Sequence, residues 1–155
     1  MIKALELLAP AKDLECGMAA IDHGADAVYI GPERFGARAA VGNSIDDIRQ
    51  LCNYAHRFLA KVYATVNTIV YDNEIGDITA LLKQLKTAGV DAVLIQDMAL
   101  ISILREIGMP YHASTQTDNR TAQKVKWLQE QGFSRVVLAR ELSINEIEEI
   151  HNMVE

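Results

Sequence analysis

The chain has 155 residues, with 15 Lys or Arg against 21 Asp or Glu and a formal net charge of −6. Half of the residues are hydrophobic and 23% are charged, which is typical of a globular domain and excludes a disordered, collagen-like or disulfide-built chain. A domain of this length buries roughly 70% of the surface of its unfolded chain. The negative charge repels phosphate backbones, so binding to nucleic acid would require a local basic patch or another domain.

The apolar runs are short. The longest, such as residues 92–95 and 136–139, are far below the ~20 residues that span a bilayer, so we expect no membrane span. Charged residues close to the first Met do not fit a secretory leader, and we expect a cytoplasmic protein. Cys16 and Cys52 lack CxxC spacing, which argues against a zinc site and a disulfide framework. We expect both cysteines in the core.

Three segments, at residues 23–31, 88–96 and 131–139, share one pattern. In each, a Gly is followed by a short apolar run without alternation. Gly suits the left-handed position that ends a helix, and the unalternating run is typical of a strand covered on both faces. The pattern predicts a repeated unit of helix followed by strand.

Taken in chain order, strands and helices alternate. The predicted strands are residues 4–9, 27–30, 62–66, 92–96, 111–114 and 136–139. The predicted helices are residues 14–21, 45–58, 75–87, 99–107, 121–131 and 144–154. Start signals are Ser44, Asp72 or Asn73, and Ser143 with Glu146 as a capping box. Nothing divides the chain, so residues 1–155 are expected to form a single domain.

Strict alternation predicts a parallel sheet, either closed as a (β/α)8 barrel or open and doubly wound. The turn after the first strand lacks GxGxxG, and no GxxxxGK[ST] occurs, which disfavours nucleotide-binding open sheets. A full barrel takes ~250 residues. We therefore expect a TIM-type α/β barrel truncated to about six βα units, the amino-terminal portion of a larger barrel. Its first and last strands would be open edges, through which we expect self-association.

The active site of a parallel barrel forms on the loops after the carboxyl ends of its strands. In this sequence those loops are polar, and we expect their side chains to converge on one rim. They include Lys12, Asp13, Arg38, Asn43, Asn67, Gln96, Asp97, Ser114, Gln116, Asn119, Arg140 and Glu141, with His112 inside the fifth strand.

Six motifs in this order resemble the amino-terminal part of the peptidase U32 family, often called collagenase-like proteases. They are ELLAPA at 6–11, GADAVYIG at 24–31, Phe35 with Arg38, Ala39 and Asn43, TVNT at 65–68, HASTQ at 112–116, and VLARELS at 137–143. The resemblance covers nearly the whole chain and implies a closed (β/α)8 barrel. Its relatives include proteins called proteases and enzymes that hydroxylate a tRNA uridine, an rRNA cytidine or a ubiquinone ring without molecular oxygen.

Several such relatives carry an iron–sulfur cluster on four cysteines, which the resemblance places just after the sixth helix. Cys16 and Cys52 belong to the first two predicted helices and do not match that motif. We therefore expect no cofactor site and no metal ligand within this chain. An iron–sulfur cluster is expected, if at all, in the carboxy-terminal part of a longer protein.

The rim supplies two kinds of candidate site residue. The catalytic candidates are His112 and Glu141, and the substrate-binding candidates are Arg38, Asn67, Ser114, Gln116 and Arg140. Each has a structural alternative. Arg38 either clamps a carboxylate or phosphate or ties its own loop to Glu33 or to a carbonyl at a strand end. His112 either acts on a proton inside the barrel or bonds neighbouring strands.

The remaining candidates also have two readings. Asn67 and Gln116 either read a polar substrate through their amides or cap the next helices. Arg140 and Glu141 either serve the site or form an ion pair with each other. Asp13 is expected to cap the first helix. Trp127 is expected to pack in the outer layer rather than to stack on a base.

Hydrolytic machinery is missing from the sequence. Ser114 and His112 lie two residues apart on one strand, about 6 to 7 Å along the chain, which is too far for an easy hydrogen bond. No GxSxG or HExxH occurs, and the four His are scattered, which disfavours a zinc peptidase.

The resemblance implies that the longer protein is a cofactor-dependent hydroxylase that modifies RNA or a quinone, with RNA or a small carboxylate or phosphate as its ligand. The alternatives are a genuine peptidase of the U32 type and a non-catalytic barrel subunit or scaffold. Residues 1–155 alone are expected to be inactive.

Overall fold

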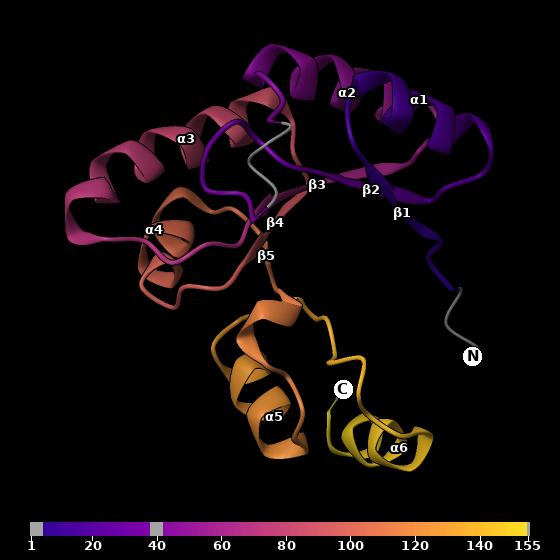
Figure 1. Cartoon of the computed structure of the whole chain (residues 1–155), viewed down its shortest axis with the longest axis vertical. Helices are drawn as coiled ribbons and strands as arrows, with labels where there is room; N and C mark the ends of the chain where they lie inside the picture. The colour runs from indigo at the N-terminus through magenta and orange to yellow at the C-terminus, as the bar shows by residue number, and fades with distance from the viewer. Residues whose placement is uncertain (1–4, 38–41, 155) are drawn as a thin grey trace.

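The computed structural model describes residues 5–37 and 42–154 and contains six parallel strands that pair in chain order, from β1 to β6 (Figure 1). The strands are β1 (Leu8–Ala11), β2 (Ala27–Ile30), β3 (Lys61–Val66), β4 (Ala92–Ile95), β5 (Tyr111–Ala113) and β6 (Arg135–Val136). The α-helices are α1 (Leu14–Asp22), α2 (Ile45–Arg57), α3 (Ile75–Ala88), α4 (Leu100–Ile107), α5 (Ala122–Glu130) and α6 (Ile144–Met153). The expected order of six βα units is confirmed.

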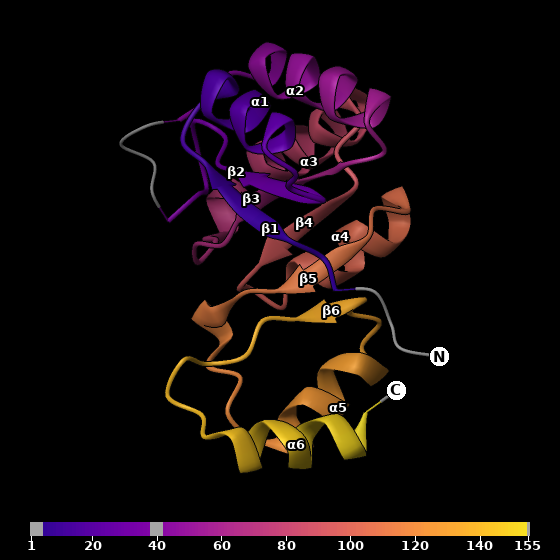
Figure 2. The ribbon, with the colours of Figure 1, turned by 90° about the vertical axis from the view of Figure 1, so that its right-hand side faces the viewer.

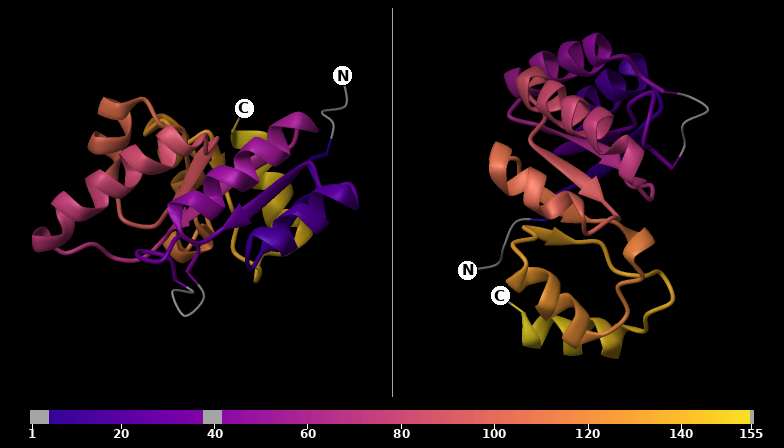
Figure 3. Two further views of the ribbon diagram at one scale, coloured as in Figure 1. Left: turned by 90° about the horizontal axis from the view of Figure 1, so that it is seen from above. Right: turned by 90° about the vertical axis from the view of Figure 1, so that its left-hand side faces the viewer.

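The sheet is curled, and the helices follow its outer side. Figures 2 and 3 show α1, α2 and α3 at one end of the molecule and α5 and α6 at the other end, with α4 between the two groups. This arrangement is a half-barrel, so the predicted fold class is confirmed. None of the described helices has the length and apolar character needed to cross a bilayer.

Helix starts follow the predicted chemistry in three of four cases. The carboxylate of Asp13 accepts from the Cys16 amide, and both Ser44 and Ser143 form capping boxes. The prediction of Asp72 or Asn73 as the cap of α3 is wrong. Those residues form a separate 3-10 turn, η2 (Asp72–Glu74), and α3 then begins at Ile75 without a side-chain cap.

The first strand was expected too early in the chain. Residues 5–7 do not join the ladder, because the Leu7 amide donates to the Asp26 carboxylate and its carbonyl accepts from the backbone of Asp26 and Ala27. Pairing begins at Leu8 and runs through Pro10. Proline is tolerated there because β1 is an edge strand, on which one row of amides needs no partner.

The sixth strand was expected to run to Ala139, but pairing ends at Val136. The Asn119 side chain donates to the Val137 carbonyl at 2.8 Å, and the Ala139 amide donates to the Asn119 carbonyl at 3.1 Å. A loop residue therefore replaces the strand ladder beyond Val136.

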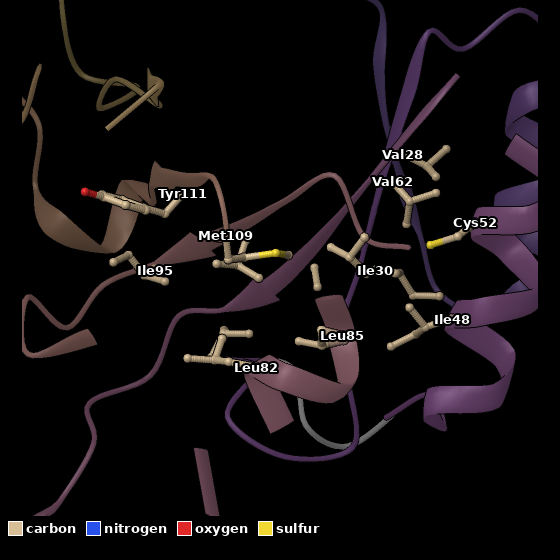
Figure 4. Close-up of a cluster of buried hydrophobic side chains, with 14 of the residues drawn as sticks. Val28, Ile30, Ile48, Cys52, Val62, Leu82, Leu85, Ile95, Met109 and Tyr111 are labelled. Atoms are coloured by element: carbon tan, nitrogen blue, oxygen red, sulfur yellow. The ribbon is translucent and has the colours of Figure 1, made fainter. Parts of the chain in front are cut away.

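The three predicted turns from helix to strand are confirmed, because Gly24, Gly89 and Gly132 all have positive φ. The main core lies between the outer face of the sheet and the helices, as Figure 4 shows. Val28 and Val62 point from the strands toward Ile48 and Leu85 on the helices. Burying each such side chain contributes about 1.5 to 3 kcal/mol relative to exposure.

The two cysteines differ in their surroundings. Cys52 of α2 is buried in this core, as predicted. Cys16 of α1 is exposed, so its expected place in the core was wrong. It lies in the first turn of α1, where its backbone amide is bonded to Asp13.

Candidate functional site

The side chains on the concave face of the sheet change in polarity from the amino end of the strands to the carboxyl end. Alternate residues of a strand point to opposite faces, so Lys61, Tyr63, Thr65 and Asn67 follow one another along the concave side. Charged groups gather at the amino end of the strands and uncharged polar groups at the carboxyl end. Between them lies a layer that contains Leu8, Ala27, Tyr29, Tyr63, Ala92, Leu94 and Val137.

The charged end is built around Glu6. Its carboxylate accepts hydrogen bonds from the Arg135 guanidinium and from the Tyr63 hydroxyl at 3.0 Å, and Lys61 lies 4.0 Å away. Arg135 holds the pKa of Glu6 below its usual range. Because Glu6 precedes β1 and Arg135 belongs to β6, this ion pair joins the two opposite edges of the sheet.

His112 of β5 lies on the middle layer and is 6% exposed. Its ring packs edge-on against the Tyr63 ring with centroids 4.8 Å apart. Burial, and then the charge of Arg135, lowers the pKa of His112 to about 4. The imidazole is therefore neutral at pH 7, with one nitrogen as donor and the other as acceptor. Among the described residues, neither ring nitrogen has a hydrogen-bond partner.

At the carboxyl end, Asn67 and Ser114 meet. The Asn67 amide donates to the Ser114 hydroxyl oxygen at 3.3 Å, and its carbonyl oxygen accepts from the Ala37 amide at 3.1 Å. The Ser114 oxygen also accepts from the backbone amide of Gln116, inside the 3-10 turn η3 (Thr115–Thr117). Both lone pairs of this oxygen are thus engaged, which leaves its O–H to donate to a ligand.

The turn before residue 38 is held tightly by the end of β3. The Thr68 hydroxyl donates to the Phe35 carbonyl, and a Cβ at Gly36 would lie 3.2 Å from the Thr65 carbonyl. Phe35 itself has a φ of 64°, an unusual value for a bulky residue. Arg38, a substrate-binding candidate, lies outside the described residues.

The other candidates are more exposed. Gln116 lies at the surface of η3, and Arg140 and Glu141 lie on the loop between β6 and α6. The alternative of an ion pair between Arg140 and Glu141 was wrong: Glu141 lies 3.6 Å from the Arg120 guanidinium instead. The structure therefore joins Asn67 with Ser114, and it leaves Gln116, Arg140 and Glu141 facing solvent.

Two buried side chains at this rim, Asn43 and Asn119, were not among the predicted site residues. Asn119 is fully buried, and Asn43 is 6% exposed. Each bonds the carbonyls of two neighbouring strands. The sequence places both on loops of the predicted rim, and each Asn comes shortly before a helix-capping residue, Ser44 or Thr121.

The residues present do not fit an iron–sulfur cluster. Cys16 is exposed on α1, and Cys52 is buried on α2, where burial raises the pKa of its thiol to about 12. A thiolate is the form that binds iron, and such clusters need several converging cysteines. Within residues 5–37 and 42–154, no three His, Cys, Asp or Glu are placed to hold a metal ion.

A serine peptidase needs a base that takes the proton of its nucleophile. Ser114 accepts two hydrogen bonds, and no described side chain accepts its proton. His112, two residues earlier, packs against Tyr63. The geometry around Ser114 thus suits a hydrogen-bond donor rather than a nucleophile.

A curled sheet of parallel strands with polar groups at the strands' carboxyl ends defines the class of (β/α)8-barrel proteins. Within that class, the chain belongs to peptidase family U32, whose profile matches residues 12–155. It is similar over 98% of its length to the structure of the U32 peptidase Mk0906, with a TM-score of 0.79, 14% identity and 66% of that chain covered.

Three sequence relatives have more specific names. The chain is 47% identical over 150 residues to the 23S rRNA 5-hydroxycytidine C2501 synthase of Escherichia coli, covering 95% of this chain and 22% of that protein. It is 38% identical to the tRNA hydroxylation protein P of Escherichia coli, covering 96% of this chain and 34% of that protein. It is 32% identical to a collagenase of Porphyromonas gingivalis, covering 99% and 37% respectively. The chain thus spans about a fifth to two fifths of these relatives.

Proposed function

We propose that this chain forms the substrate-facing half of the barrel in an enzyme that hydroxylates a pyrimidine base of RNA. The observation that carries the proposal is the rim of Asn67 and Ser114 above the layer that contains Tyr29 and Tyr63, in a chain 47% identical to an rRNA hydroxycytidine synthase. RNA modification would place the protein in the cytoplasm.

The chemistry of the rim suits a nucleobase. A pyrimidine is a flat, uncharged ring with donors and acceptors on its edge, and enzymes read such a base with hydrogen bonds and apolar packing. The Ser114 O–H is available as a donor, and the Asn67 amide keeps one N–H and one lone pair. In the layer beneath, Tyr29 is partly exposed and can pack against the base, whereas Tyr63 and Leu94 are buried.

His112 has a definite task in this proposal. With a pKa of about 4, it remains neutral during the reaction and offers a hydrogen bond toward the concave side without introducing charge. A neutral donor favours an uncharged base over a phosphate. Binding of the RNA backbone falls to other parts of the longer protein, because this chain carries a net charge of −6.

We also place the binding site of any cofactor outside this chain. Since Cys16 and Cys52 do not converge, any iron–sulfur cluster would be held by residues outside this chain. When bound, such a cluster would supply electron transfer. The residues described above would orient the base and exclude water from it.

The test uses Escherichia coli cells that lack both the 23S rRNA 5-hydroxycytidine synthase and the tRNA hydroxylation protein P. The full gene that includes the coding sequence of this chain is introduced, and RNA digests are analysed for hydroxylated pyrimidine nucleosides by mass spectrometry. Hydroxycytidine in rRNA or hydroxyuridine in tRNA supports the proposal. Absence of both, with cleavage of gelatin by the purified protein, would instead favour the U32 peptidase alternative.

A further inference from the structure

Two buried asparagines occupy equivalent places at the two opposite edges of the curled sheet, both at the carboxyl ends of the strands. The last register pair of β1 and β2 is Ala11 with Ile30, and the next two residues are Lys12 and Gly31. The Asn43 amide nitrogen donates to the carbonyls of both, at 3.0 and 2.9 Å. One NH2 group thus joins two neighbouring strands where their ladder ends.

The same arrangement recurs at β5 and β6. Their last register pair is Ala113 with Val136, and the next two residues are Ser114 and Val137. The Asn119 amide nitrogen donates to both carbonyls, at 2.9 and 2.8 Å. Its own carbonyl oxygen lies 2.6 Å from the Thr117 hydroxyl, within hydrogen-bond distance.

The second of these asparagines acts directly on a candidate site residue. The Ser114 carbonyl accepts from Asn119 at 2.9 Å. The Thr117 hydroxyl lies 2.7 Å from the same carbonyl and 2.6 Å from the Asn119 side-chain oxygen, and its single proton is donated to one of the two at a time. These contacts fix the peptide plane of Ser114, and with it the direction in which its side chain leaves the backbone. Through Val137 and Ala139, Asn119 also fixes the start of the loop that carries Glu141.

We infer that Asn43 and Asn119 are positioning residues that hold the carboxyl ends of β1 with β2 and of β5 with β6 at fixed spacing, and that Asn119 thereby orients Ser114 toward the bound base. This inference rests on the proposed function. A carboxamide suits the task because it provides two donors on one nitrogen, whereas Asp, Ser and Ala provide none, one and none.

The test compares Asn119→Ala and Asn119→Ser with Asn53→Ala, which makes the same truncation at an exposed position of α2. Amide hydrogen exchange is followed by NMR. Exchange rates of the amides of Thr117, Val137 and Ala139 are divided by the rates of amides in β2 to β4. In Asn119→Ala this ratio should be at least about tenfold higher than in the wild type, because two buried hydrogen bonds are lost. Asn119→Ser keeps one donor and should fall between, and it serves as the readable variant if the Ala variant does not fold.

A variant at Asn43 tests whether the change in amide exchange is local to each asparagine. Asn43→Ser should accelerate exchange at the amides of Asn43 and its neighbours and leave Val137 and Ala139 at wild-type rates. Equal acceleration at the rim and in β2 to β4 would overturn the inference, because it would show a general loss of stability.

Hydroxylation in the complemented cells separates this inference from the proposed function. Rim-selective exchange together with at least about tenfold less hydroxypyrimidine in Asn119→Ser, and none of this loss in Asn53→Ala, supports both. Rim-selective exchange with wild-type hydroxylation would refute the role of Asn119 while the proposed function stands. No hydroxylation by the wild-type gene would refute the proposed function, and the exchange pattern alone would then decide whether Asn119 positions the rim.

Discussion

Replacing Glu6 by Gln should weaken the link between the two edges of the half-barrel. The Glu6 carboxylate accepts from two nitrogens of Arg135 and from the Tyr63 hydroxyl, and the side chains of Glu6 and Arg135 are 22% and 37% exposed. Hydrogen bonds to a charged partner are worth about 1.5 to 3 kcal/mol. Because the pair is partly hydrated, we expect the lower part of that range, about 2 kcal/mol for Glu6→Gln.

Unfolding monitored by circular dichroism measures this loss. For a domain of this size, about 2 kcal/mol corresponds to a decrease in Tm of roughly 4 to 8 °C. A double-mutant cycle with Arg135→Gln should give a coupling free energy of about 1 to 2 kcal/mol. The matched control is the pair of Arg34 and Asp77, whose side chains are 59% and 60% exposed, so Asp77→Asn should change stability by less than about 0.5 kcal/mol.

The effect should also depend on pH. Because the folded-state pKa of Glu6 is lowered, its contribution is complete above the unfolded-state value near 4.5 and is lost as the pH falls through the folded-state value. Glu6→Gln should remove this part of the acid dependence. A coupling no larger than that of the Arg34 and Asp77 pair would refute the edge-to-edge link.

Three other predictions concern separate features. The pKa of His112 is about 4 in the folded state against 6.5 in the unfolded state, so the unfolded chain takes up the proton first as the pH falls. The free energy of unfolding should therefore decrease by up to about 3 kcal/mol between pH 6.5 and 4. Denaturant titrations of His112→Gln should lack this decrease. Gly132→Ala should lower the free energy of unfolding by at least about 1 kcal/mol more than Gly24→Ala. Both positions have positive φ, but only at Gly132 would the Cβ lie 2.7 Å from the Tyr111 hydroxyl. Equal losses of stability on thermal unfolding would be inconsistent with this contact. The open edges at β1 and β6 should cause self-association, and light scattering from a dispersed monomer at high concentration would count against it.

The alternation of strands and helices is largely readable from the sequence, because buried parallel strands and capped helices leave local signals. Apolar runs and Ser44 or Ser143 placed most helix bounds within one residue of those observed. The errors at the ends of β1 and β6 arose because a distant residue changes the pairing. The ends of β1 and β6 depend on Asp26 and Asn119, which the local sequence of those strands does not reveal.

The candidate site was only partly predictable for a similar reason. The βα order indicates which loops share a rim, and Asn67 and Ser114 do meet there. Which polar groups face solvent and which are engaged depends on three-dimensional contacts. Glu141 lies beside Arg120 rather than Arg140, and the buried amides of Asn43 and Asn119 became visible only through the carbonyls they join.

The proposed role of Ser114 in RNA hydroxylation is to donate a hydrogen bond to the base. It is tested most directly by measuring the hydroxypyrimidine content of RNA in complemented cells that carry the wild-type gene, Ser114→Ala, or Ser102→Ala, a control at an exposed position of α4. We predict hydroxylation with the wild type and Ser102→Ala and a loss of at least about tenfold with Ser114→Ala, as expected when one hydrogen bond to the substrate is removed. Wild-type levels with Ser114→Ala, or a gelatin-cleaving activity that this substitution abolishes, would contradict the account.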